Sequence, residues 1–263
     1  MIIGNSRPQA LTKTLFLEKS RTIVLTGPSH VGKASFALQE LESSVHPSDL
    51  FITPSGIDGI REALTFSRCC PLNSNQRTIL VDDADSLSFP AQDALLKICE
   101  EPHSGLRLIL VTHDLHSLQS PLRSRMRHII EWDTLEFDDM MKFAETAPAV
   151  PSKILLELSG GRPGIYQTMV ENAGFEELHE ALKNSFFSKD LFLKSTPSVI
   201  KSLKGVGAIR DGVIQVLRFN ARLTLDPYAG LPLLQYASIL HNYPSVNSEI
   251  YWQRMALDLF NVT

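Results

Sequence analysis

The sequence predicts an α/β protein with a mostly parallel sheet in its first half and helices alone in its second half. Short apolar runs rich in β-branched residues alternate with segments of helical apolar spacing as far as about residue 133, a pattern typical of parallel sheets. From Thr134 onward the apolar residues keep a helical spacing to the end of the chain. The length of 263 residues suits one large domain or two to three smaller ones.

The first half contains five predicted strands and three predicted helices. The first strand is a β-branched run that stops at Gly27, and the third strand ends in a run of acids. Pro90 lies at the start of the third predicted helix and Pro102 ends it. The strands are predicted at residues 21–27, 48–55, 77–85, 106–114 and 128–132, and the helices at 33–43, 57–69 and 90–102.

The second half contains a weaker predicted boundary near Glu176. Broad apolar faces at helical spacing in residues 207–225 and 231–243 indicate helices that share a core and have faces left for neighbours. The three predicted parts are residues 1–133, 134–176 and 177–263.

The composition argues against several classes of protein. A formal net charge of −4 is a poor match for a chain that wraps nucleic acid by itself, so a nucleic-acid role would be shared with partners. The three cysteines, Cys69, Cys70 and Cys99, form no CxxC pair and predict neither a disulfide framework nor a four-ligand zinc site. The N-terminal residues do not resemble a signal peptide, and no apolar run has membrane-spanning length. A cytoplasmic protein without a membrane partner is therefore expected.

The stretch LTGPSHVGKASF, residues 25–36, resembles a phosphate-binding loop that departs from its pattern at one position. Gly27, Gly32 and Lys33 match G-x-x-x-x-G-K between a predicted strand and a predicted helix, the context that this motif requires. Ala34 lacks the hydroxyl that holds Mg²⁺, and Ser35 lies one residue later, turned by about 100° around the helix. Taken alone, the loop is equally compatible with an ordinary strand–helix turn that carries a solvated lysine.

Acids at the end of the third predicted strand favour the nucleotide interpretation. In phosphate-loop proteins the first acid, Asp82, would bind Mg²⁺. Asp83 stands where motor ATPases carry a glutamate that orients the attacking water, and its side chain is about one methylene shorter. The alternative is a solvated strand end.

Seven stretches follow one another along the chain: IIGNSRPQALTKTL, GPSHVGK, HPSDLFITPSG, GIDGIREAL, TILVDDADSLSFPAQDALLKICEEP, LILVTHD and PLRSRM. In this order they resemble the AAA+ clamp-loader subunits, and within that family the delta-prime type of bacterial DNA polymerase III. The resemblance covers roughly residues 2–170, and AQDALLKICEEP at residues 91–102 is its most specific part. The resemblance implies a Rossmann-like AAA+ core with a parallel sheet, a small helical lid and an all-helical C-terminal collar.

The resemblance also implies roles for single residues. Gly27, Gly32 and Lys33 match its phosphate loop, Asp82 its metal-binding acid, and Thr112, followed by His113, its sensor-one position. Arg125, in the turn PLRSRM after the fourth strand, matches an arginine finger that enters the nucleotide site of a neighbouring subunit. Alignment on Gly161 puts Gly164 where active ATPases carry the sensor-two arginine, and Arg162 falls two residues early.

These matches and departures imply a largely non-hydrolysing scaffold that donates Arg125 to an adjacent ATPase subunit while a sliding clamp is loaded in DNA replication. The implied partners are a motor ATPase subunit, a delta-like subunit, the sliding clamp and, through the assembled complex, primer-template DNA. We expect a monomer in isolation, no zinc, and at most weakly bound ATP or ADP, with Mg²⁺ at Asp82. Two alternatives stay open: an active ATPase subunit of the same loader, and an unrelated AAA+ remodeller or helicase loader.

Overall fold

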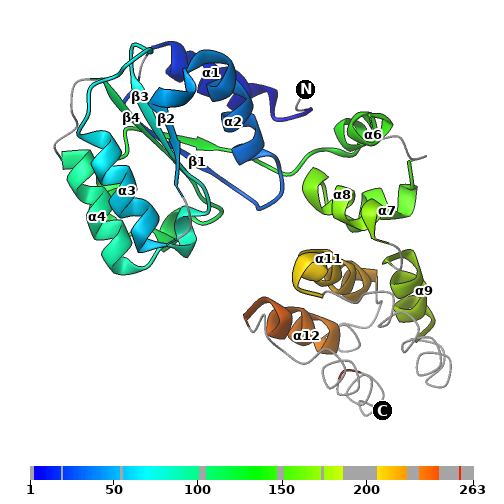
Figure 1. Cartoon of the computed structure of the whole chain (residues 1–263). Helices are drawn as coiled ribbons and strands as arrows, with labels where there is room; N and C mark the ends of the chain where they lie inside the picture. The colour runs from blue at the N-terminus through cyan, green and yellow to red at the C-terminus, as the bar shows by residue number, and fades with distance from the viewer. Residues whose placement is uncertain are drawn as a thin grey trace. The chain divides into compact units, whose positions relative to one another are not determined.

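The computed structural model of the chain describes residues 3–18, 20–53, 56–100, 105–146, 151–172, 175–185, 206–223, 231–242 and 255. The chain divides into two compact units, residues 1–135 and 136–263 (Figure 1). The first unit is α/β and the described part of the second is helical, which confirms the predicted fold class.

The first unit is built on a five-stranded parallel sheet with the order β2-β3-β4-β1-β5. All five predicted strands are present, each shorter than the apolar run that predicts it. Val24 in the central part of β1 pairs with Leu110 of β4 on one side and Ile129 of β5 on the other. The strands are β1 (Thr22–Thr26), β2 (Leu50–Ile52), β3 (Arg77–Val81), β4 (Leu106–Val111) and β5 (His128–Glu131).

The three predicted helices of this unit are present as α2, α3 and α4, and two further helices, α1 and α5, were not predicted. In α1 the apolar spacing gives little signal, because Leu11 and Leu17 are exposed and the one fully buried residue is Thr12. The α5 helix is only six residues long. The helices are α1 (Ser6–Leu17), α2 (Lys33–Ser44), α3 (Ile57–Ser67), α4 (Phe89–Glu100) and α5 (Ser120–Arg125), with single 3-10 turns η1 (Pro47–Asp49), η2 (Ala84–Ser86) and η3 (Leu115–Ser117).

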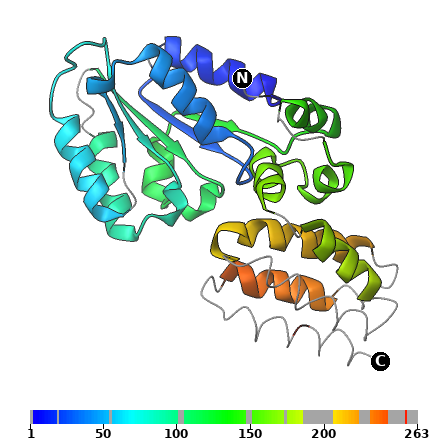
Figure 2. The same cartoon turned by 45° about the vertical axis from the view of Figure 1, so that its right-hand side comes forward.

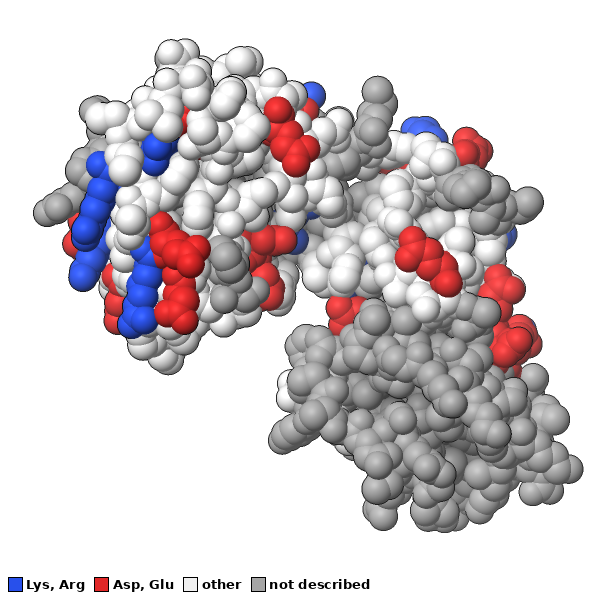
Figure 3. All heavy atoms as spheres, in the orientation of Figure 1, with Lys and Arg blue, Asp and Glu red and all other residues white. Residues whose placement is uncertain are grey.

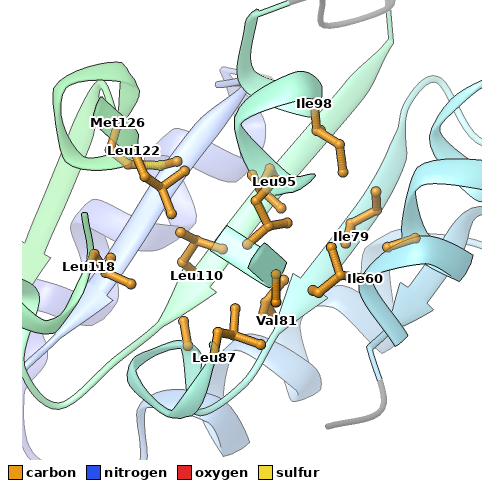
Figure 4. Close-up of a cluster of buried hydrophobic side chains, with 14 of the residues drawn as sticks. Ile60, Ile79, Val81, Leu87, Leu95, Ile98, Leu110, Leu118, Leu122 and Met126 are labelled. Atoms are coloured by element: carbon orange, nitrogen blue, oxygen red, sulfur yellow. The ribbon is translucent and has the colours of Figure 1, made fainter. Parts of the chain in front are cut away.

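Two apolar cores cover the two faces of the sheet. Successive strand side chains point to opposite faces, so Val24 joins a core with α3, α4 and α5, whereas Ile23 and Leu25 join a core with α2. Figure 4 shows the first of these cores, in which Leu95 of α4 and Leu122 of α5 lie near Leu110 of the sheet. In β1, β3 and β4 every residue is buried, and this burial on both faces explains their continuous apolar runs.

The second unit is helical wherever it is described. Its longest described helix, α11, contacts α8, α9 and α12 (Figure 2). Gly212 of α11 faces the ring of Phe175, and a Cβ there would lie 2.8 Å from a ring carbon. The helices are α6 (Phe137–Glu145), α7 (Lys153–Leu158), α8 (Pro163–Glu171), α9 (Phe175–Ser185), α11 (Val206–Leu223) and α12 (Leu231–Asn242).

The two predicted domain boundaries lie near Thr134 and near Glu176. The boundary near Thr134 lies next to the division between the two units, and the boundary near Glu176 lies in the first turn of α9. The separation of the second unit into lid and collar stays a prediction. Among the described residues, no helix is both long and apolar enough to cross a membrane.

Candidate functional site

The loop between β1 and α2 has a backbone that only glycine can provide at Gly27. Its φ is +134°, and a Cβ at this position would lie 2.0 Å from the carbonyl oxygen of Trp132. Gly32, the residue before α2, also has a positive φ, of 98°. Residues other than glycine rarely adopt these backbone angles. The two glycines of the predicted motif therefore fix the shape of the loop.

Lys33 begins α2, and its side chain turns back onto the loop. Only 6% of Lys33 is exposed, and its Nζ donates to the carbonyl oxygens of Gly27 and Pro28, each at 2.6 Å. The ammonium therefore lies at the loop that would surround phosphate groups. A phosphate bound there would compete with these carbonyls for the ammonium donors.

No hydroxyl occupies the position after Lys33. Ala34 is half-buried and packs against the core between α2 and the sheet, whereas Ser35 is exposed. The residues of the loop fit a phosphate cradle, with backbone N–H groups at the start of α2 and a lysine. They do not provide the hydroxyl ligand for Mg²⁺, which leaves Asp82 as the predicted metal ligand.

The acids after β3 form contacts of their own. Asp82 and Asp83 are both exposed, and the N–H of Asp83 donates to Asp82 Oδ1 at 2.8 Å. Asp83 has a φ of 52°, in the left-handed region. Its carboxylate lies 3.7 Å from Nδ1 of His113, while Nε2 of the same ring lies 2.5 Å from Asp85 Oδ2. His113 thus stands between two carboxylates.

Thr112 is oriented by Asp85. Thr112 is 1% exposed, and its hydroxyl donates to Asp85 Oδ1 at 2.9 Å, which also accepts the N–H of His113 at 3.1 Å. Among the described residues, Asp83, Asp85 and His113 form a group whose ligand atoms lie close enough to meet one metal ion, and Asp82 is not part of it. The sequence indicated Asp82, Asp83 and Thr112 but gave no role to the Asp85–His113 contact, which connects Thr112 with Asp83.

The topology brings the loop, the acids and Thr112 to one edge of the sheet. The three strands that precede them are parallel, and β4 lies between β3 and β1. Ligands of such sheets bind outside the carboxyl ends of the strands. The predicted nucleotide-site residues of the first unit therefore share the edge at which this fold binds ligands.

Arg125 lies at the opposite edge of the sheet. Its carbonyl accepts a hydrogen bond from the hydroxyl of Thr22, the first residue of β1, at 3.3 Å. Because a strand advances about 3.3 Å per residue, this anchor is about 16 Å from Gly27. The expected loop around Arg125 is instead the end of helix α5. In this position Arg125 lies far from the phosphate loop of its own chain.

The guanidinium of Arg125 is held by two acceptors. Its Nη2 lies 2.6 Å from Glu100 Oε1 at the end of α4, and Nη1 donates to the carbonyl of Pro121 at 2.9 Å. Burial raises the pKa of the adjacent Cys99 thiol to about 12, although the nearby Arg125 acts against this shift. Glu100 lies within the stretch that is most specific for the resemblance, but the sequence indicated no role for it because its partner is 25 residues away.

The predicted sensor-two stretch lies in the second unit. Arg162 directly precedes α8, and Gly164 is within its first turn. Burial lowers the pKa of Arg162, the nearby Arg218 acts in the same direction and Asp211 acts against it. Arg162 is thus placed beside two charged residues of α11, within its own unit.

The order of the parallel strands, the glycine-bearing loop after β1 and the acids after β3 define the AAA+ type of phosphate-loop fold. Solved structures agree with this fold. A DNA polymerase III gamma subunit-related protein of Thermotoga maritima has a TM-score of 0.58 at 16% identity, covering 96% of this chain and 99% of that one. The RuvB Holliday junction branch migration motor of the same organism has a TM-score of 0.51 at 15% identity, covering 99% of this chain and 84% of that one.

Sequence comparisons point to DNA polymerase III. A family model described as "DNA polymerase III, delta subunit" matches residues 37–131. The gamma subunit of Buchnera aphidicola is 32% identical over 87 residues, which are 33% of this chain and 24% of that protein. The delta' subunit of Pseudomonas aeruginosa is 27% identical over 144 residues, 48% of this chain and 42% of that protein.

These matches confirm the resemblance to AAA+ clamp-loader subunits of DNA polymerase III. The chain spans less than half of the length of the curated relatives it matches. Subunits named gamma, gamma/tau and delta' all match, so the similarity does not single out one type of subunit.

Proposed function

We propose that this chain is a delta-prime-like subunit of a DNA polymerase III clamp loader that hydrolyses little ATP itself and donates Arg125 to the ATP site of a neighbouring subunit. The observation that carries the proposal is the position of Arg125. It lies at the edge of the sheet opposite the phosphate loop of its own chain, anchored at Thr22. A cation in that place can serve a nucleotide held by another chain, as arginine fingers supplied in trans do.

The arrangement of the chain's own loop supports weak hydrolysis. Ala34 provides no hydroxyl for Mg²⁺, Lys33 is engaged by two loop carbonyls, and Asp83 lies beside His113. A nucleotide bound here would contact the N–H groups of the loop and Lys33, with Asp82 available to Mg²⁺. ATP or ADP is therefore expected to bind weakly and to turn over slowly.

The charge distribution supports a role in DNA contact that the chain shares with its partners. Figure 3 shows acidic and basic side chains interleaved over the α3–α4 side of the first unit, where no continuous basic patch covers the face that is drawn. With a net charge of −4, the chain is a poor match for binding DNA by itself, so primer-template DNA and the sliding clamp would be contacted by the assembly as a whole. The motor ATPase and a delta-like subunit are the proposed direct partners, and the helical second unit supplies apolar faces for assembly.

The test is single-turnover ATP hydrolysis by a complex of this chain with the gamma-type subunit of its own source. Arg125→Ala is expected to assemble normally and to slow the adjacent ATP site by about 10³-fold or more. Arg127→Ala, an exposed neighbour, serves as the matched control and should change this rate little. Equal rates for Arg125→Ala and the unmodified complex would refute the finger.

The size of the purified chain tests the alternative assembly. We expect a monomer in isolation, whereas a stable homohexamer would favour a self-assembling remodeller. Substantial ATP turnover by the isolated chain would favour an active ATPase subunit instead. Both measurements use the full chain without any partner.

A further inference from the structure

The contact between Glu100 and Arg125 joins two helices at the edge where the proposed finger lies. Glu100 is the last residue of α4 and Arg125 the last residue of α5. Their side chains are 49% and 36% exposed, and the N–O distance is 2.6 Å. Ion pairs with this exposure contribute little to stability, so support of the fold is a poor explanation for the pair.

The base of the Arg125 side chain is fixed by its surroundings. Leu122 and Met126, on either side of it in the sequence, are buried in the core beneath α4 and α5. The Thr22 hydroxyl bonds the carbonyl of Arg125 and accepts the N–H of Arg127 at 3.2 Å. Motion of Arg125 is thereby limited to its side chain.

The guanidinium is then fixed at its two terminal nitrogens. Nη1 donates to the carbonyl of Pro121 and Nη2 to Glu100. Of these two acceptors, the carbonyl belongs to the same helix as Arg125, and Glu100 alone comes from another element. Guanidinium carries five N–H donors, so three remain for an anionic ligand while both contacts persist.

We propose that Glu100 is a positioning residue for Arg125, which orients the guanidinium so that its remaining N–H groups meet the phosphates of a nucleotide in an adjoining subunit. This inference rests on the proposed function. Orientation matters because a long exposed side chain samples many rotamers, and each rotamer that misses the phosphate reduces the effective concentration of the cation there. The carboxylate limits that sampling before the two subunits meet.

A second effect of Glu100 opposes the first. A carboxylate beside the guanidinium reduces its net positive charge, so Glu100 could also hold Arg125 away from a phosphate. The two effects predict opposite changes in the rate of ATP hydrolysis when the Glu100 side chain is removed. If Glu100 positions Arg125, hydrolysis at the neighbouring site becomes slower. If Glu100 restrains Arg125, hydrolysis there becomes faster.

The experiment measures single-turnover ATP hydrolysis by the full complex together with ATP affinity at the adjacent site. We expect Glu100→Ala to lower the hydrolysis rate about tenfold with affinity unchanged. Glu100→Gln keeps an amide oxygen at the same reach and should restore most of the rate. Glu62→Ala, an exposed glutamate on α3, is the matched control and should leave the rate unchanged.

The double variant Glu100→Ala/Arg125→Ala decides whether Glu100 acts through Arg125. It should be no slower than Arg125→Ala alone, because the effect of positioning requires the guanidinium. An additive loss, an unchanged rate in Glu100→Ala, or a faster one would overturn the inference. If Arg125→Ala itself has no effect, the proposed finger fails instead, so the two failures are distinguishable.

Discussion

The ammonium of Lys33 lies 2.6 Å from the carbonyl oxygen of Gly27, so the first glycine and the lysine of the phosphate-type loop contact each other directly. The lysine of such a loop normally reaches the outer phosphates. In this chain it is buried and already engaged by two carbonyls of the loop.

Lys33→Ala is expected to leave clamp loading by the assembled complex nearly unchanged, within about twofold, because hydrolysis at this site does not drive loading under the proposed function. The measurement is the rate at which the complex loads the sliding clamp onto primed DNA. Arg125→Ala is the comparison variant, and it should be defective. A tenfold or greater loss by a folded Lys33→Ala complex would mean that the site is used.

Gly27→Ala is expected to destabilise the first unit strongly. The new Cβ would meet the Trp132 carbonyl at 2.0 Å, and φ would stay at +134°. Neither the strand end nor the loop can shift without disturbing the sheet, so we expect a loss of about 2–4 kcal/mol or no folded protein. Urea unfolding, followed by the fluorescence of Trp132 in a Trp252→Phe background, measures it.

Gly56→Ala provides the matched control for that variant. Gly56 also has a positive φ, of 97°, but a Cβ there would meet nothing within 4 Å. With φ 97° and ψ −177°, Gly56 lies in a region that only glycine uses readily, so the cost should be limited to backbone strain of about 1–3 kcal/mol. Equal losses for the two variants would show that strain, and not the contact with Trp132, makes Gly27 necessary.

Asp49 is expected to be a main determinant of stability on the β2 side of the sheet. It is fully buried, and its carboxylate accepts the N–H groups of Leu72, Asn73 and Ser74 at 2.8, 2.7 and 2.7 Å. An amide at this place offers one acceptor oxygen and turns an NH₂ group toward donors. We expect Asp49→Asn to cost about 2–3 kcal/mol in the free energy of unfolding, whereas the exposed Asp58→Asn should cost less than about 0.5 kcal/mol.

The same carboxylate predicts a pH dependence. Burial alone would raise the pKa of Asp49, but the three backbone N–H groups and Arg77 outweigh it and hold the pKa below its ordinary value of 3.8. The stabilisation is therefore fully present above pH 3.8 and is lost as the pH falls through the lower folded-state pKa. Unfolding measured from about pH 7 down to about pH 3 should show an acid-dependent loss that is smaller in Asp49→Asn.

The sheet was predictable from the sequence, whereas the connections between its elements were not. Strands such as β1 and β4 are buried on both faces, so their continuous apolar runs identify them. In α1 the exposed Leu17 and Leu11 weaken the helical pattern, and α5 is too short to show one. The local pattern of apolar residues therefore identified the elements that are buried most deeply.

The candidate site was predictable where a motif lies within one loop. Gly27, Gly32 and Lys33 are close in sequence, so their spacing suggested a phosphate-type loop, and the acids after the third strand favoured that interpretation over an ordinary strand–helix turn. Contacts such as Glu100–Arg125 and Asp85–Thr112 join residues 25 and 27 positions apart. They depend on which strand lies beside which, and the sequence does not give that order.

The hydroxyl that the loop lacks can be tested by Ala34→Ser. Ala34 is half-buried in the first turn of α2, and serine adds one oxygen at the position from which such loops bind Mg²⁺. We expect Mg²⁺-dependent affinity for ATP to rise about tenfold over the unmodified chain, the scale of one added ligand. Hydrolysis should remain slow, because Asp83 is shorter than glutamate and lies 3.7 Å from His113.

Titration of the isolated Ala34→Ser chain with ATP, with and without Mg²⁺, measures the change in affinity, and phosphate release measures the rate of hydrolysis. Ser35→Ala is the control, and it should change neither quantity because Ser35 is turned away by about 100°. Rapid turnover in Ala34→Ser would show that the missing hydroxyl alone keeps the site inactive, and an effect of Ser35→Ala would show that Ser35 takes its place.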